Sequence, residues 1–247
     1  MGCLDQKVCV VTGAGGDIGS AICRLYASEG ASAVIAAEHH IGSVDAWKKD
    51  NDTFKAVIPY TVNLDIESEI KALVQYVKKN YGRIDVLVNA AGIEFNEKIG
   101  LIDYSHMQQM FSTNVFGLIE LVQYTARIMM RQKEGSIINI ASVVGMYGNP
   151  GQAVYSATKG AVISFTKSAA KELASLGIRV NAISPGLTDT KMIRQTSEEA
   201  LQARISKIGM GRMASPDDIA QAAGFLASDR SNYITGQILG VDGGTIM

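Results

Sequence analysis

The sequence has little cysteine and almost no net charge. Its 247 residues include three cysteines, and the acidic and basic side chains nearly cancel to a formal charge of -1. Such a balance offers no electrostatic footprint for nucleic acid or for an anionic membrane. Cys3, Cys9 and Cys23 have no metal-ligand spacing, and an odd number of cysteines on apolar segments indicates reduced structural thiols in a reducing compartment.

Long hydrophobic runs and histidine clusters are also missing. No apolar run approaches the roughly 18 residues of a membrane helix, and residues 1–7 lack the basic-then-apolar pattern of a signal peptide. We therefore expect a cytoplasmic protein with no membrane or nucleic-acid partner. His39 and His40 are adjacent, which should point them in different directions, and His106 stands alone, so we expect no metal site.

What is present is a regular alternation of short apolar runs with amphipathic segments. This pattern predicts an α/β fold, a Rossmann-type, doubly wound parallel sheet with helices on both faces. Nothing resembles a linker or a repeat, so we expect one domain. Strands are expected at residues 7–12, 33–37, 56–63, 84–89, 136–141, 179–184 and 238–241, with helices at 20–29, 67–81, 104–131 and 155–175 and one starting at Ser215.

A glycine-rich turn, residues 13–19, joins the first expected strand to the first expected helix. In a doubly wound sheet, ligands bind beyond the carboxyl ends of the strands, and glycines let the backbone approach a pyrophosphate that the helix N-terminus stabilises. Such a turn can also be a simple strand-to-helix connection. Its place after the first strand favours dinucleotide binding.

A second group of residues carries acid–base chemistry. Ser142 is followed by Tyr155, and Lys159 comes four residues after Tyr155, on the same face if this segment is helical. A nearby cation stabilises a phenolate, and a shift of the tyrosine pKa from about 10 to near 7 takes roughly 4 kcal/mol. Alone, the pair is also what a tyrosine packed beside a solvated lysine would look like.

With both groups in view, the chain resembles the short-chain dehydrogenase/reductase family from about residue 7 to residue 244. The matching motifs occur in the family's order, which makes the set more specific than any one of them. They are Thr12-Gly13 with Gly19, Asn89-Ala90-Ala91-Gly92, Asn114, Ser142, Tyr155 with Lys159, and Pro185-Gly186 with Thr188 and Thr190.

The resemblance implies a role for each of four catalytic residues. Tyr155 would be the acid/base, and Ser142 would hydrogen-bond the substrate oxygen. Lys159 would lower the pKa of Tyr155 and bind the nicotinamide ribose. Asn114 would hold a water that links Lys159 to solvent, although a polar residue at this place can also simply relieve a helix kink.

The resemblance also implies an organisation and a set of cofactor contacts. Residues 7–100 would form the dinucleotide-binding half and 101–247 the catalytic half, with a mobile substrate lid at 187–211, in a homotetramer that pairs the long helices and the last strand. The expected cofactor contacts are Gly13, Gly15, Asp17, Ile18, Gly19, Glu38, Asn63, Leu64, Asn89, Ala90, Ala91, Gly92, Tyr155, Lys159, Pro185, Gly186, Thr188 and Thr190.

The chain departs from the family pattern at two positions. Asp17 replaces the middle glycine of the turn, where a carboxylate would repel a diphosphate. We expect its side chain to turn away and interact with the helix N-terminus, where an acid is favoured, so that cofactor binding survives. Ala90 replaces the usual second asparagine, which is a mild change.

The end of the second expected strand bears on the choice of cofactor. The family's NAD enzymes usually place an aspartate at the position of Ala37, and its NADP enzymes often place basic residues at the positions of Glu38 and Gly16. A carboxylate can accept hydrogen bonds from ribose hydroxyls but repels a 2′-phosphate. We therefore predict NAD(H) over NADP(H). Protonated His39 and His40 could offset one charge.

The substrate is less well specified. The overall look is close to 3-oxoacyl-carrier-protein reductases, which usually use NADPH and commonly carry a basic residue at the position of Leu176; Arg131 could serve instead. We favour oxidation or reduction of small secondary alcohols or ketones, with acyl-carrier reduction and a non-catalytic dinucleotide-binding module as alternatives. The expected pocket residues are Glu94, Phe95, Val143, Val144, Tyr147, Asn149, Gln152, Gly186 and the 187–211 segment with Met192, Ile193 and Met210.

Overall fold

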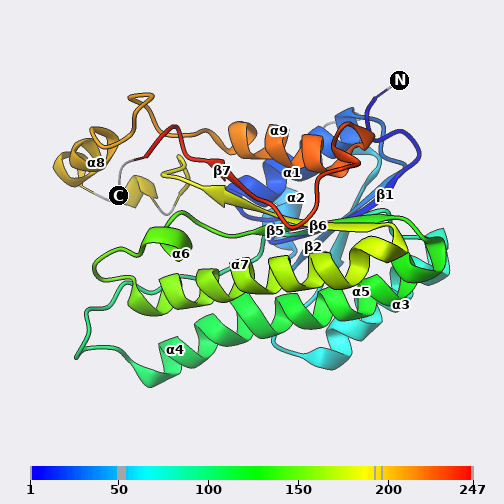
Figure 1. Cartoon of the computed structure of the whole chain (residues 1–247), viewed down its shortest axis with the longest axis horizontal. Coiled ribbons are helices and arrows are strands. Elements are labelled where there is room, and N and C mark those ends of the chain that lie inside the picture. Colours follow the sequence, from blue (N-terminus) through cyan, green and yellow to red (C-terminus); the bar gives the residue numbers. More distant parts are fainter. Residues whose placement is uncertain (1, 49–53, 192, 196, 246–247) are drawn as a thin grey trace.

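The chain folds around one parallel sheet that is flanked by helices (Figure 1). The sheet has seven strands in the order β3-β2-β1-β4-β5-β6-β7. The computed structural model describes residues 2–48, 54–191, 193–195 and 197–245. All neighbouring strands pair in parallel, as the alternation of strands and helices predicts. The strands are β1 (Val8–Thr12), β2 (Ala33–Glu38), β3 (Val57–Thr61), β4 (Val86–Asn89), β5 (Gly135–Ile140), β6 (Ile178–Pro185) and β7 (Ile238–Val241).

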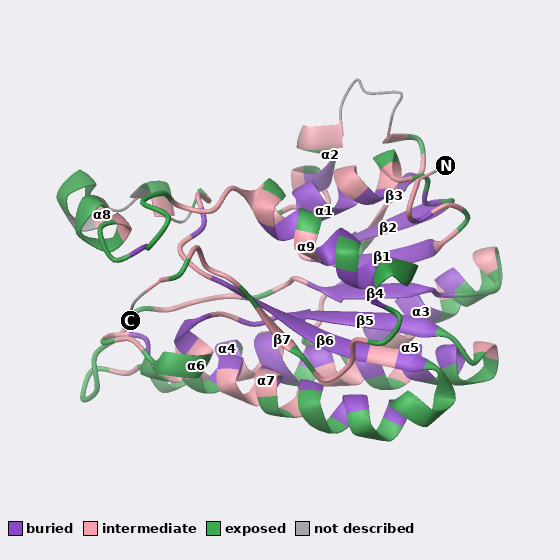
Figure 2. Ribbon diagram, turned by 45° about the horizontal axis from the view of Figure 1, so that its top comes forward, coloured by how far each residue is buried: buried purple, intermediate pink, exposed green. Residues whose placement is uncertain are grey.

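Helices cover both faces of the sheet and bury its central strands (Figure 2). Successive side chains of a strand point to opposite faces, so Val8 and Val10 pack with α3, α5 and α7, while Cys9 and Val11 pack with α1 and α9. The helices are α1 (Asp17–Ser28), α2 (Gly42–Lys48), α3 (Glu67–Tyr81), α4 (Tyr104–Phe111), α5 (Leu118–Gln132), α6 (Val144–Tyr147), α7 (Ala153–Leu173), α8 (Glu198–Ile205) and α9 (Pro216–Ala227).

The long helix expected at 104–131 is interrupted. A π-helix, Ser112–Gly117, separates α4 from α5. Two contacts explain the interruption. A Cβ on Gly117 would lie 2.4 Å from the Leu64 carbonyl oxygen, so only a glycine lets this turn touch the loop after β3. The buried Asn114 points its amide at the loop after β4.

Two other helices differ from expectation. Helix α1 begins at Asp17 rather than at Ser20, so the glycine turn is shorter than predicted. The stretch between β2 and β3, for which we expected no helix, contains α2, whose buried residue is Val44. One buried position gives no periodic signal. This helix is instead held by Trp47, whose indole nitrogen donates to the Ala14 carbonyl oxygen at 3.0 Å.

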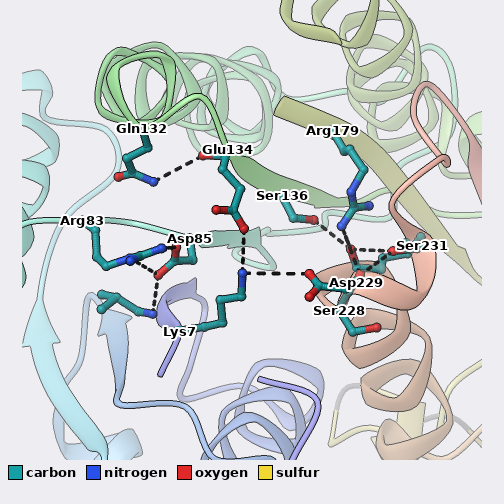
Figure 3. Close-up of polar contacts among 12 residues, drawn as sticks. Lys7, Arg83, Asp85, Gln132, Glu134, Ser136, Arg179, Ser228, Asp229 and Ser231 are labelled. Atoms are coloured by element: carbon teal, nitrogen blue, oxygen red, sulfur yellow. Dashed lines mark hydrogen bonds and ion pairs between the residues drawn. The ribbon is translucent and has the colours of Figure 1, made fainter. Parts of the chain in front are cut away.

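The amino ends of the strands carry a network of charged side chains (Figure 3). Asp85 is 3% exposed; it accepts a hydrogen bond from the Val8 amide at 2.8 Å and further hydrogen bonds from Nε and Nη2 of Arg83. Nearby, the Lys7 ammonium lies 2.7 Å from the Glu134 carboxylate. These contacts tie the start of β1 to the starts of β4 and β5. The glycine turn lies at the opposite, carboxyl end of β1.

Candidate active site

The glycine turn packs too tightly for side chains at several of its positions. Gly13 has φ +65°, and a Cβ there would lie 2.7 Å from the Ala91 Cα. A Cβ on Gly19 would lie 2.1 Å from the Gly13 carbonyl oxygen, and one on Gly15 would lie 1.8 Å from the Ser43 hydroxyl oxygen. The turn therefore lies directly against the loop that follows β4.

The N-terminus of α1 fits an anion. Its N-cap is Gly16, and among the described residues no side chain caps the first amide groups of the helix, which carry the positive end of the helix dipole. Thr12 fixes the turn against the next loop, because its hydroxyl accepts hydrogen bonds from the Ala90 and Ala91 amides at 3.2 and 3.3 Å. The cradle of glycines and the uncapped helix end suit the diphosphate of a dinucleotide.

Asp17 lies in the first turn of α1, but its carboxylate turns to a different partner than we expected. Its Oδ2 atom accepts a hydrogen bond of 2.7 Å from the backbone amide of Lys191. The side chain thus reaches the 187–211 segment instead of capping its own helix. The hydrogen bond from the Lys191 amide partly compensates the negative charge of the Asp17 carboxylate.

Glu38, at the carboxyl end of β2, also faces the glycine turn. Its two carboxylate oxygens accept hydrogen bonds from the Gly15 amide at 2.9 Å and from the His39 amide at 2.8 Å. The carboxylate therefore stands beside the turn that would hold the diphosphate. The prediction that His39 and His40 point apart is wrong, because their rings meet edge to face with centroids 4.5 Å apart.

Asn114 connects the loop after β4 to α7. Its Oδ1 atom accepts from the Ile93 amide at 2.8 Å, and its Nδ2 atom donates to the Ile93 carbonyl at 2.9 Å and to the Thr158 hydroxyl at 3.2 Å. Gly92 makes room for this arrangement, since a Cβ there would lie 3.3 Å from Asn114 Oδ1 and 3.4 Å from Lys159 Nζ. Both amide hydrogens of Asn114 and one acceptor position on its oxygen are thus used, close to the Lys159 ammonium.

Lys159 and Tyr155 lie side by side on α7, as their spacing predicted. The Lys159 nitrogen is 5.6 Å from the centre of the Tyr155 ring and donates to the Ile140 carbonyl oxygen at 2.8 Å. The lysine is 4% exposed. This burial lowers the pKa of Lys159 to about 8, and the negative charge of Glu94 opposes the shift.

The pKa of Tyr155 shifts in the direction opposite to our expectation. Burial raises the pKa of the phenol well above its ordinary value, the negative charge of Glu94 raises the pKa further, and a hydrogen bond with Ser142 lowers it. Desolvation is the largest contribution to the raised pKa of Tyr155 and favours the neutral phenol.

A cavity of about 750 Å³ opens beside these groups. Its wall includes Ser142, Tyr155 and Lys159. Ile18, Ala90, Gly92, Pro185, Gly186, Thr188 and Thr190, all expected to contact the cofactor, also line it. The expected pocket residues that line it are Glu94, Val143, Val144, Tyr147, Asn149, Gln152, Gly186 and Ile193.

Some expected pocket residues lie elsewhere, and some lining residues were missed. Phe95 is not in the cavity wall but stacks on His106, with ring centroids 3.9 Å apart. Met210 is 68% exposed and outside the wall, and Met192 lies outside the described residues. The expected 187–211 segment also contributes Leu187, Arg204, Lys207 and Ile208 to the wall. Sequence reasoning missed the lining residues outside the expected set; these are Ile93, Ile140, Ala141, Gly148, Pro150 and Thr245.

The remaining expected cofactor contacts follow the carboxyl ends of β3 and β4. Asn63 and Leu64 lie in the loop after β3, where the Asn63 side chain accepts a hydrogen bond from the Asp65 amide at 2.9 Å. Asn89 ends β4, is 3% exposed and donates to Asn139 Oδ1 at 2.8 Å. Its own Oδ1 is buried without a hydrogen-bond partner among the described residues.

The fold and the site together define an oxidoreductase that works with a bound dinucleotide. The family model described as "Enoyl-(Acyl carrier protein) reductase" matches residues 13–245. The chain is 42% identical to the 3-oxoacyl-acyl-carrier-protein reductase FabG of Thermotoga maritima over 245 residues, and 37% identical to the FabG of Vibrio cholerae over 244 residues, with 99% of each chain covered in both cases.

The solved structure titled "Crystal structure of gox2181" superposes with a TM-score of 0.93 at 32% identity, covering 98% of this chain and 96% of that one. The chain belongs to the short-chain dehydrogenase/reductase family. It is an enzyme that acts on CH–OH or keto groups and uses a nicotinamide dinucleotide. Within the described part of the chain, every helix is too short or too polar to cross a membrane.

Proposed function

We propose that the enzyme uses NAD(H) to interconvert a secondary alcohol and a ketone. The observation that carries the proposal is the Glu38 carboxylate, which is bound to the Gly15 amide at the end of β2. A carboxylate beside the glycine turn can accept hydrogen bonds from the adenosine ribose hydroxyls and repels a 2′-phosphate. The cofactor, when bound, supplies or accepts the hydride.

The residues of this chain would manage the proton. Ser142 would hold the substrate oxygen while Tyr155 donates a proton to it during reduction, or removes one during oxidation. A phenol whose pKa is raised by burial suits the donor role, because burial favours the neutral form that carries the proton. We assign Lys159 to the nicotinamide ribose and to stabilisation of the phenolate, and Asn114 to a water that links Lys159 to solvent.

The remaining expected features are part of the same proposal. We assign residues 7–100 to dinucleotide binding and 101–247 to catalysis, with 187–211 as a substrate lid. We propose a cytoplasmic homotetramer. Free cysteines at positions 3, 9 and 23 support a reducing compartment. The exposed apolar side chains Tyr104 (67%) and Phe116 (60%), on α4 and the π-helix, support a subunit contact there.

The second candidate function is reduction of a 3-oxoacyl group on an acyl carrier protein, which the names of the FabG relatives favour. An acidic carrier needs a basic docking surface. At the position where such reductases commonly carry a basic residue this chain has Leu176, which is 37% exposed. Arg131, which is also exposed, is the remaining candidate.

Equilibrium binding of NADH and NADPH, followed through nicotinamide fluorescence, tests the proposal. We expect NADH to bind at least about tenfold more tightly, and Glu38→Ala to reduce that ratio. A preference for NADPH would favour acyl-carrier reduction instead. Full turnover by a Tyr155→Phe variant on its best substrate would favour the third alternative, a non-catalytic dinucleotide-binding module.

A further inference from the structure

One wall of the cavity holds a carboxylate that the proposed chemistry does not use. The Gln152 side chain, 7% exposed, donates a hydrogen bond to Glu94 Oε1. Gln152 is in turn fixed by Asn149, whose Nδ2 atom donates to Gln152 Oε1 at 2.7 Å. The three side chains form a chain of hydrogen bonds that fixes the orientation of the Glu94 carboxylate through its Oε1 atom.

The other carboxylate oxygen is available to a ligand. Among the described residues, Glu94 Oε2 has no hydrogen-bond partner, and no ion pair includes Glu94. The carboxylate is close enough to the reacting groups for its charge to raise the pKa of both Tyr155 and Lys159. A partly buried carboxylate with an open oxygen favours a hydrogen-bond donor next to it.

Cations line the same cavity from α8. Arg204 lies near the C-terminus of this helix, and Lys207 lies just after the helix. Within the described chain neither side chain forms an ion pair. Helix α8 lies well apart from α7, which carries Tyr155 (Figures 1 and 2). The cavity wall therefore carries a carboxylate near the reacting groups and two cations on α8 and just after it.

We propose that the substrate is a hydroxylated ketone whose far end carries an anion. A hydroxyl next to the reacting carbon donates to Glu94, and a carboxylate or phosphate at the other end pairs with Arg204 and Lys207. An ammonium group at the far end of a substrate would be repelled by these two cations, and an anionic group next to the carbonyl would be repelled by Glu94. The inference rests on the proposed function: reduction adds a hydride to the carbonyl carbon and a proton to its oxygen, and leaves the neighbouring hydroxyl unchanged.

Three five-carbon probes distinguish the contribution of the Glu94 carboxylate from that of the two cations. They are 5-hydroxy-4-oxopentanoate, 4-oxopentanoate, which lacks the hydroxyl, and 1-hydroxypentan-2-one, which lacks the carboxylate. Their affinities are measured by ligand-observed NMR titration, with and without NADH. We expect 5-hydroxy-4-oxopentanoate to bind roughly tenfold more tightly than either analogue.

Variants assign each preference to its residues. Glu94→Gln should reduce the preference for the hydroxyl to below about threefold and keep the preference for the carboxylate. The double variant Arg204→Gln with Lys207→Gln should keep the preference for the hydroxyl and reduce the preference for the carboxylate to below about threefold. Lys171→Gln, which removes an exposed cation of α7 that is remote from the cavity wall, is the matched control and should change neither.

Equal affinity for all three probes, binding of none, or an unchanged hydroxyl preference in Glu94→Gln would overturn the inference. Because the titration measures binding without turnover, it does not depend on catalysis. If the preferences hold and no ketone is reduced, the proposed function fails alone. If ketones are reduced without these preferences, the inference fails alone.

Discussion

The Lys159 ammonium nitrogen lies 5.6 Å from the centre of the Tyr155 ring and donates its hydrogen bond to the backbone carbonyl of Ile140. The cation is therefore held beside the phenol by the end of β5. Within the described part of the chain no carboxylate forms an ion pair with this buried cation, and its desolvation cost is offset only in part. A site of this kind is expected to cost the fold stability.

Lys159→Met should therefore stabilise the protein near neutral pH while abolishing activity. A lysine pKa lowered from 10.5 to about 8 corresponds to about 3 kcal/mol. The folded state is destabilised by this full amount below pH 8, where the lysine is protonated in both the folded and the unfolded state. The destabilisation disappears as the pH rises to about 10.5. The gain in unfolding free energy of the variant should shrink across that window. Urea denaturation at pH 7, 9 and 10.5 measures it, and a constant difference would contradict the argument.

Asp17→Gly should change NADH affinity by less than tenfold. In the wild type the Asp17 carboxylate accepts the Lys191 amide, so its charge is partly satisfied away from the diphosphate. In this variant the 187–211 segment should also be more accessible to a protease, and limited proteolysis should cleave it about threefold faster than in the wild type. Asp17→Asn keeps an acceptor for the amide and should be cleaved like the wild type. NADH binding more than tenfold tighter in Asp17→Gly would show that the aspartate is not tolerated by the cofactor site.

Gly19→Ala should weaken both the fold and cofactor binding. Its Cβ would lie 2.1 Å from the Gly13 carbonyl oxygen, and neither backbone can move without disturbing the contact with Ala91. We expect a loss of about 2–3 kcal/mol in unfolding free energy and at least tenfold in NADH affinity. Gly16→Ala is the control, because its Cβ would meet the same oxygen at 3.3 Å. Thermal unfolding and NADH titration of both variants decide whether close packing, rather than glycine flexibility in general, sets the requirement.

Asp85→Ala should destabilise the protein by about 3 kcal/mol. It removes a buried carboxylate and leaves the Val8 amide and the Arg83 guanidinium without it. Glu134→Gln alters the neighbouring, more exposed pair with Lys7 and should cost less than about 1 kcal/mol. Urea denaturation measures both variants. NADH affinity should not change in either, since the network lies at the amino ends of the strands, and equal costs would contradict the burial argument.

The sheet was predictable because strands such as β1 and β4 are short, mostly apolar runs, and both faces of these strands are buried. The placement of Tyr155 beside Lys159 followed from helical spacing alone. The direction of the Tyr155 pKa did not, because burial and the charge of Glu94 come from segments distant in sequence. The partner of Asp17 was equally hidden, since Lys191 lies 174 residues further along the chain. Local patterns predict elements, but contacts between loops depend on the fold.

The π-helix at 112–117 has a consequence for chain length. A π turn uses about one residue more than the α-helix it interrupts. Deleting a single codon in this stretch would let α4 and α5 merge into one regular helix and rotate α4 by about 100° around its axis. Asn114 would then lose its pairing with the Ile93 backbone. The helix therefore tolerates substitutions along its surface far better than any change in its length.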